Sequence, residues 1–208
     1  MKKALFFPVF FFLSFALFAH PHMCFTSEFE LIFSNNKLKG VNVIWTFDKF
    51  FSLDIISGYD LNRDGYFSKA ETDEVYSNAF VYTSNYGHFT FIRVGNTRKS
   101  PETIARKDFS VYQKNGSLQY KFYVDLSSYT EHEIYIACYD YTFFCDISYP
   151  KNPLRIVGMH GKVQHSIVEN KNYPIYYDPF GAIDDNRVYY KWAPGLNTYY
   201  PSEIKITY

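Results

Sequence analysis

The sequence predicts a mainly β protein, an antiparallel β-sandwich with a helix-loop-helix inserted between early strands. Three observations support this prediction. Apolar and polar residues alternate along many short segments, which is the pattern of strands with one buried face. Seven or more such segments follow one another, as in antiparallel sandwiches. One stretch, at about 48–81, instead has apolar residues three or four positions apart, which is the spacing of helices.

The first two strands are predicted to form a hairpin. Apolar and polar side chains alternate over residues 25–33 and again over residues 41–47. The residues between them, Ser34-Asn35-Asn36-Lys37, are of types that favour turns. After the helical insert, further strands are expected at 88–94, 106–113, 120–126, 134–138, 143–149, 154–158 and 162–168.

The last segment, 170–208, contains four prolines and is predicted to be an irregular tail closed by a short strand at 204–208. We expect this tail to pack on the domain formed by residues 20–169.

With 21 basic and 21 acidic residues the formal charge is zero, which argues against a nucleic-acid partner. Beyond the first 19 residues no apolar run approaches the ~20 residues that a membrane-spanning helix needs.

Residues 1–19 have the order of a secretory signal peptide. Lys2 and Lys3 precede an apolar stretch over 4–18, and Ala19 is a small residue at the expected cleavage site. We therefore expect an exported protein, periplasmic or extracellular; a membrane anchor and a different cleavage site stay open as alternatives.

Cleavage after Ala19 would make His20-Pro21-His22 the mature terminus. The freed amine and imidazole of His20 can chelate one ion, and His22 lies within reach if the chain bends. Neutral nitrogen ligands suit Ni²⁺, Co²⁺, Zn²⁺ and Cu²⁺. His20 and His22 are therefore candidate ligands of a transition metal, and the alternative is a frayed terminus with two incidental imidazoles.

Residues 60–71 match the twelve-residue calcium loop of an EF-hand at every ligand position. The predicted calcium ligands are Asp60, Asn62, Asp64, the carbonyl of Tyr66, Ser68 and Glu71. Gly65 occupies the sharp turn, and Ser68 with Glu71 also forms a capping box that would start a helix without metal. The alternative is a solvated turn between two helices. Because one such loop occurs, we expect structural calcium and no cooperative sensing.

The remaining candidate groups predict no catalytic site. Three cysteines leave one unpaired, and a Cys138–Cys145 disulfide and free thiols are both open. The histidines outside the terminus are scattered, no HExxH pair occurs, and neither a nucleophile–base pair nor a glycine-rich phosphate loop accompanies Asp140 and Asp146. We therefore expect a protein that is not an enzyme.

Four segments together resemble one family. They are Ala19-His20-Pro21-His22, Trp45-Thr46-Phe47-Asp48-Lys49-Phe50-Phe51, the acidic loop, and Tyr139-Asp140-Tyr141-Thr142-Phe143-Phe144. In this order they resemble an uncharacterised family of exported bacterial proteins labelled as the periplasmic component of an ABC-type transport system and associated with nickel or cobalt transport. The resemblance covers roughly residues 19–150. It implies divalent-metal handling in the cell envelope, with an inner-membrane cation permease as partner.

Three functions are compatible with these observations. The first is a periplasmic metal-binding accessory protein linked to transition-metal transport, because a β-rich chain of this size has no room for the two lobes of a solute receptor. The second is a calcium-stabilised interaction or adhesion module without a transport role. The third is a copper enzyme with a histidine brace, which needs another histidine beside the terminus.

Overall fold

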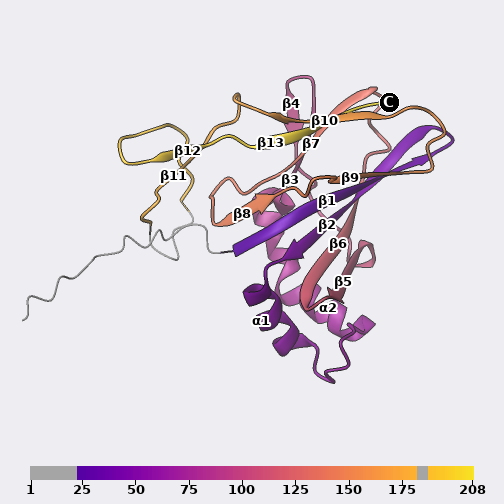
Figure 1. Cartoon of the computed structure of the whole chain (residues 1–208), viewed down its shortest axis with the longest axis vertical. Helices are drawn as coiled ribbons and strands as arrows, with labels where there is room; N and C mark the ends of the chain where they lie inside the picture. The colour runs from indigo at the N-terminus through magenta and orange to yellow at the C-terminus, as the bar shows by residue number, and fades with distance from the viewer. Residues whose placement is uncertain (1–22, 182–186) are drawn as a thin grey trace, which may run out of the picture.

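The computed structural model describes residues 23–181 and 187–208 (Figure 1). The protein is mainly β, as the sequence predicts, with two sheets whose inner faces share one core. The predicted signal peptide, His20 and His22 lie outside the described residues. Among the helices of the described part, none combines the length and hydrophobicity needed to cross a membrane.

The first sheet has the strand order β5-β6-β2-β1-β8, and β9 also pairs with β1. Its strands are β1 (Met23–Ser34), β2 (Lys37–Phe47), β5 (Phe109–Lys114), β6 (Ser117–Asp125), β8 (Cys145–Ser148) and β9 (Leu154–Val157). β1 and β2 pair antiparallel around a turn at Asn35 and Asn36, so the predicted hairpin is confirmed.

The second sheet has the order β10-β13-β7-β3-β4. Its strands are β3 (Thr90–Val94), β4 (Thr97–Lys99), β7 (Glu133–Cys138), β10 (Gln164–Glu169) and β13 (Ser202–Thr207). A separate hairpin pairs β11 (Ile175–Tyr177) with β12 (Asn197–Tyr199). The helices α1 (Lys49–Tyr59) and α2 (Lys69–Asn78), with the short helices η1 (Phe80–Phe89) and η2 (Arg106–Asp108), lie between strands of the two sheets in the sequence.

Two features differ from the prediction. The free edge of β1 pairs with both β8 and β9 in parallel, so the first sheet is not wholly antiparallel. This is possible because β1 is 12 residues long and accommodates two four-residue strands along one edge. The segment 170–208 is also more regular than predicted, since it supplies the β11–β12 hairpin and an inner strand of the second sheet, β13, whose Ile204 and Ile206 are fully buried.

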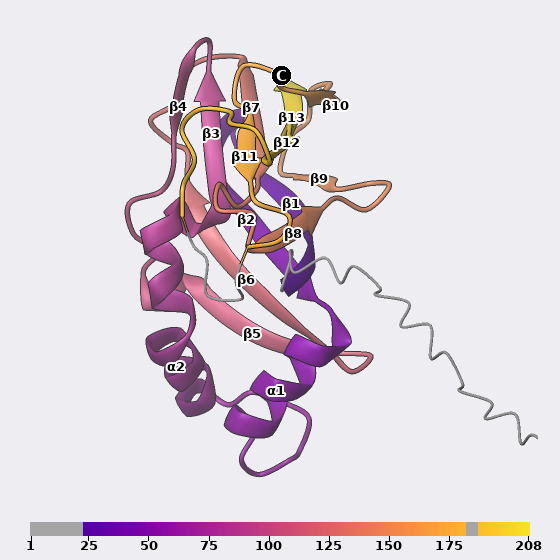
Figure 2. The ribbon, with the colours of Figure 1, turned by 90° about the vertical axis from the view of Figure 1, so that its left-hand side faces the viewer.

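The core between the sheets is aromatic around Trp45 of β2, which is 1% exposed. Its ring centroid lies 4.9 Å from that of Phe122 on β6 and 5.0 Å from that of Phe25 on β1. Phe80, at the start of η1, lies 6.0 Å away and joins the helical segment to this core. Both α-helices consequently sit at one end of the sandwich, beside β5 and β6 (Figure 2).

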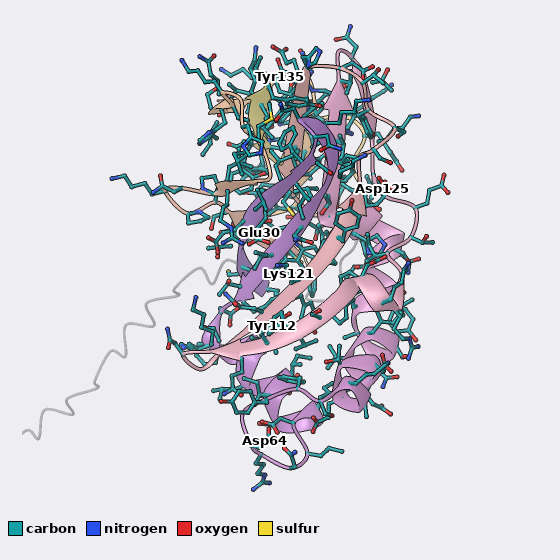
Figure 3. All side chains as sticks on the ribbon, turned by 90° about the vertical axis from the view of Figure 1, so that its right-hand side faces the viewer. Glu30, Asp64, Tyr112, Lys121, Asp125 and Tyr135 are labelled. Carbon is teal, nitrogen blue, oxygen red and sulfur yellow. The ribbon has the colours of Figure 1, made fainter. Side chains whose placement is uncertain are left out.

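Glu30 connects four strands on the outer face of the first sheet. It accepts hydrogen bonds from Asn42 of β2 at 3.1 Å and Lys121 of β6 at 2.8 Å, and it forms an ion pair with Arg155 of β9. Figure 3 shows Glu30 on β1 and Lys121 on β6, the two strands on either side of β2. Partial burial alone would raise the pKa of Glu30, but the contacts with Lys121 and Asn42 outweigh it and lower the pKa.

His88 gives the fold a predicted sensitivity to acid. The residue is 2% exposed, Nδ1 lies 2.7 Å from the hydroxyl of Thr83, and Nε2 has no hydrogen-bond partner in the part of the chain that the structure describes. Burial lowers its pKa from 6.5 to about 4. His88 in the unfolded chain therefore takes up a proton near pH 6.5, whereas His88 in the folded chain stays neutral down to about pH 4. The free energy of unfolding should fall as pH drops from about 6.5 to about 4, by up to roughly 3 kcal/mol.

Urea unfolding of the wild type and of His88→Gln at pH 7.5, 6 and 4.5 tests this expectation. Gln does not titrate, so the variant should lose less stability between pH 7.5 and 4.5 than the wild type loses. Parallel pH curves would contradict the assignment to His88.

Candidate metal centre

The loop between α1 and α2 is held by contacts at the start of each helix. Asp48 caps α1, because its carboxylate accepts from the N–H groups of Phe50 at 2.8 Å and Phe51 at 3.0 Å. One turn on, the fully buried hydroxyl of Ser52 donates to the Asp48 carbonyl and accepts from the N–H of Leu118 on β6 at 2.8 Å. The entering helix is thereby fixed to the first sheet.

The leaving helix begins at the capping box that the sequence predicts. The Ser68 hydroxyl accepts from the N–H of Glu71, and the Glu71 carboxylate accepts from the N–H of Ser68. Further along α2, the hydroxyl of Tyr76 donates to the carbonyl of Ile104 at 2.6 Å. The two ends of the loop are therefore placed by helices that are each joined to the sandwich.

Inside the loop, the predicted ligand side chains fold onto the backbone. Asp60 accepts from the N–H of Gly65 at 3.1 Å, Asn62 from that of Asp64 at 3.0 Å, and Asp64 from that of Tyr66 at 2.8 Å. Gly65 has φ +80°, which explains why glycine stands at this turn. Figure 3 shows Asp64 at the tip of the helical segment, at the end away from the sheets.

Asp60 carries the clearest sign of a missing positive charge. The residue is only 4% exposed, and while Oδ2 accepts from Gly65, the buried Oδ1 has no hydrogen-bond partner among the described residues. A buried carboxylate oxygen without a donor costs free energy. Hard oxygen ligands are what Ca²⁺ prefers, so a calcium ion at this oxygen fits the residues present.

Glu71, at the last position of the loop, joins its two ends. One carboxylate oxygen accepts from the N–H of Ser68 at 2.8 Å and the other from the N–H of Leu61 at 3.1 Å. The N–H and hydroxyl of Ser68 hold the pKa of Glu71 below its usual value. The side chain is therefore stabilised as the anion that a calcium ligand must be.

As the side chains stand, the carboxylates do not converge on one point. Across residues 23–181 and 187–208, no three His, Cys, Asp or Glu side chains lie close enough together to hold a metal ion. In the loop, Asn62 donates from Nδ2 to Asp64 at 2.9 Å, which occupies an oxygen that calcium would need. Binding would therefore replace this contact, and the calcium site stays a prediction.

The described chain begins beside the predicted transition-metal ligands, at Met23. Cys24 is exposed, its N–H donates to Asp48 at 3.2 Å, and it stands opposite Asp146 in the β1–β8 ladder. Partial burial first, and then Asp146 and Asp48, raise the pKa of the Cys24 thiol. Because a metal binds the thiolate, Cys24 is poorly prepared to add a sulfur ligand to the two histidines.

Two of the other histidines, His160 and His132, lie at the end of β1 away from Met23. β1 has 12 residues, which span about 40 Å. The N–H of His160 donates to the side chain of Asn36, in the turn that follows the far end of β1. His132 packs on the ring of Tyr208, and that ring contacts Phe33 at the same end of β1. His165 lies on β10 of the other sheet. His88 is buried in the core.

The structure also shows the state of the three cysteines and the surroundings of Asp140 and Asp146. Cys24, Cys138 and Cys145 are free thiols. Of the two alternatives that the sequence leaves open, the structure therefore has free thiols and not a Cys138–Cys145 disulfide. Burial raises the pKa of Cys138 to about 11. Asp140 is 2% exposed whereas Asp146 is exposed at the surface, so they do not share an environment.

Sequence reasoning missed Asp48 and Ser52, which place the loop. A signal for Asp48 was available, because an Asp directly before a segment with helical periodicity is an N-cap pattern. Nothing local marks Ser52, whose partner on β6 is 66 residues away.

Residues 5–208 match the family DUF1007, described as "Protein of unknown function (DUF1007)". A protein of Haemophilus influenzae named "Uncharacterized protein" is 25% identical over 162 residues, which are 76% of this chain and 77% of that protein. Since the family match extends over both sheets, the helical segment and the tail, this protein belongs to the DUF1007 family.

Proposed function

We propose that the protein is an exported, periplasmic metal-binding accessory protein linked to divalent transition-metal transport, with a calcium ion as a structural element. The observation that carries the calcium half is the buried Oδ1 of Asp60, which lies in a loop of calcium-ligand sequence and has no donor within residues 23–181 and 187–208. Calcium would be held by Asp60, Asn62, Asp64, the Tyr66 carbonyl, Ser68 and Glu71. The ion would compensate their negative charge and connect the end of α1 to the start of α2.

The transition-metal half rests on His20 and His22. Export followed by cleavage at Ala19 would create the α-amine that completes a three-nitrogen chelator for Ni²⁺, Co²⁺, Zn²⁺ or Cu²⁺. The resemblance to exported proteins associated with nickel or cobalt transport supports the same role and an inner-membrane permease as the recipient or source of the ion. In this proposal the sandwich presents the chelating terminus at the start of β1.

Removing both imidazoles is expected to abolish specific transition-metal binding. The protein that starts at His20 should bind Ni²⁺ with an affinity more than about 100-fold above that of a His20→Ala, His22→Ala form, since even outer-shell changes cost 10–100-fold. Isothermal titration with Ni²⁺ at saturating calcium measures the difference. Mass spectrometry of the exported protein establishes where the chain begins.

The matched control replaces His160 and His165 by Ala, because these histidines are exposed or half-exposed and lie away from the start of β1. Its Ni²⁺ affinity should equal that of the wild type. Equal affinity of the His20→Ala, His22→Ala form and the wild type would refute the transition-metal half and leave the calcium half standing.

A specific observation favours a second candidate, the calcium-stabilised interaction module. Phe50 and Leu53 on α1 are 89% and 59% exposed, and Leu61 in the loop is 78% exposed. Large apolar side chains exposed together are typical of contact surfaces. If this candidate holds, Ca²⁺ raises the melting temperature while Ni²⁺, Co²⁺, Zn²⁺ and Cu²⁺ leave it unchanged.

A further inference from the structure

A cavity with aromatic walls lies beside the start of β1, away from the calcium loop. Its volume is about 370 Å³, within the range of roughly 300–1,000 Å³ that is usual for small-molecule sites. The walls come from the start of β1, the end of β2, α1, η1, β6 and the loop before β8. Most of the lining side chains are aromatic, among them Trp45, Phe51, Tyr82, Tyr86, Phe89 and Phe144.

One carboxylate lies among these rings. Asp140 contributes to the lining and is 2% exposed. Its Oδ1 accepts from the N–H of Thr142 at 2.8 Å and from the hydroxyl of the same residue at 2.7 Å, and Oδ2 accepts from the N–H of Cys145 at 3.0 Å. All three donors are neutral. They fix the carboxylate in place and satisfy its hydrogen bonds without cancelling its charge.

No side chain of the cavity supplies the opposite charge. In the described part of the chain, none of the lining residues is Lys, Arg or His, and no ion pair involves Asp140. The cavity is therefore an apolar, aromatic space with a net negative charge at its wall. A ligand that complements it is cationic and carries its charge on an apolar body.

This chemistry selects an organic cation over a metal ion. The faces of aromatic rings attract ammonium groups, most strongly where water is excluded. A hard metal ion needs several oxygen ligands, whereas the described residues that line the cavity supply one carboxylate, that of Asp140, and otherwise only Thr and Tyr hydroxyls. A quaternary or methylated ammonium group uses the rings and the single carboxylate together.

We propose that this cavity binds a small organic cation of the trimethylammonium type, with the aromatic rings facing the cationic head and Asp140 as its counter-charge. The proposal goes beyond metal handling and is independent of calcium and of His20 and His22. It adds to this protein a second recognition site, for an organic solute.

A pair of isosteric probes tests the charge requirement. Choline and its uncharged carbon analogue 3,3-dimethyl-1-butanol have the same shape, and each is titrated into the exported protein by calorimetry. Choline should bind at least about ten-fold more tightly, because a desolvated cation–π contact contributes that much or more. Equal binding of the two probes, or binding of neither, would overturn the proposal.

Variants locate the site. Tyr82 is 62% exposed, so Tyr82→Ala removes part of the wall with little effect on the core, and Tyr112→Ala, at 49% exposure on β5, is the matched control. Choline affinity should fall at least about three-fold in Tyr82→Ala and stay unchanged in Tyr112→Ala.

Asp140→Asn should reduce choline binding to the level of the uncharged analogue. If Asp140→Asn does not fold, the two probes still test the charge requirement, and Tyr82→Ala with its control Tyr112→Ala still tests the location. Equal choline affinity of these two Tyr variants would contradict binding in this cavity.

Discussion

Asp60→Asn is expected to abolish the stabilisation of the protein by calcium. At a calcium concentration a hundredfold above the dissociation constant, the wild type should gain about 2.7 kcal/mol in free energy of unfolding. For a chain of this size that gain raises the melting temperature by roughly 5–10 °C. The variant keeps an oxygen for the N–H of Gly65 but loses the charge of a buried calcium ligand, so its melting temperature should not respond to calcium.

Without calcium, we expect a different order of stability for the wild type and Asp60→Asn. The wild type then carries a buried carboxylate oxygen to which no described residue donates, and Asp60→Asn removes that charge. We expect the metal-free variant to be at least as stable as the metal-free wild type. Thermal unfolding in EDTA and in 2 mM Ca²⁺ gives both comparisons. Asp54→Asn, on the exposed side of α1, is the control and should respond to calcium as the wild type does. A full calcium response of Asp60→Asn would rule out the loop as the calcium site.

Phe80→Ala should destabilise the protein by about 3–5 kcal/mol, the cost of deleting a large, fully buried aromatic side chain. Phe80 is 0% exposed, its ring stacks on Phe109 at 4.2 Å, and it lies 5.1 Å from Phe122. Its loss opens a cavity where η1 meets the first sheet. Guanidinium unfolding measures the change in free energy.

The control for this variant is Phe50→Ala, since Phe50 is 89% exposed on α1. The same chemical change there should stay within about 0.5 kcal/mol of the wild type. If the two variants lost equal stability, Phe80 would not be the residue that joins the helical segment to the core.

The elements that could be predicted from the sequence are those whose partners are close in the chain. The β1–β2 hairpin has its turn residues and its alternation side by side, and the loop of residues 60–71 has its glycine and its predicted calcium ligands in one stretch. The capping box of Ser68 and Glu71 is local in the same way and is confirmed.

What could not be predicted depends on distant partners. The parallel pairing of β1 with β8 and β9 joins residues more than a hundred positions apart, and alternation alone does not reveal which edge a strand joins. β13 was predicted only as a short strand that closes a proline-containing segment, yet it pairs on both sides. The aromatic cavity draws its walls from five separate stretches, so its rings appear in the sequence only as core residues.

The position of β13 has a consequence for biosynthesis. The second sheet needs this strand between β10 and β7, and its partners on β7 lie far earlier in the chain, as in the pairs Ile204–Ile136 and Ile206–Ile134. All of the chain between β7 and β13 must therefore leave the ribosome before this edge of β7 can pair, and contacts this distant in sequence form slowly. Until then that edge stays unpaired and can accept a strand of another polypeptide.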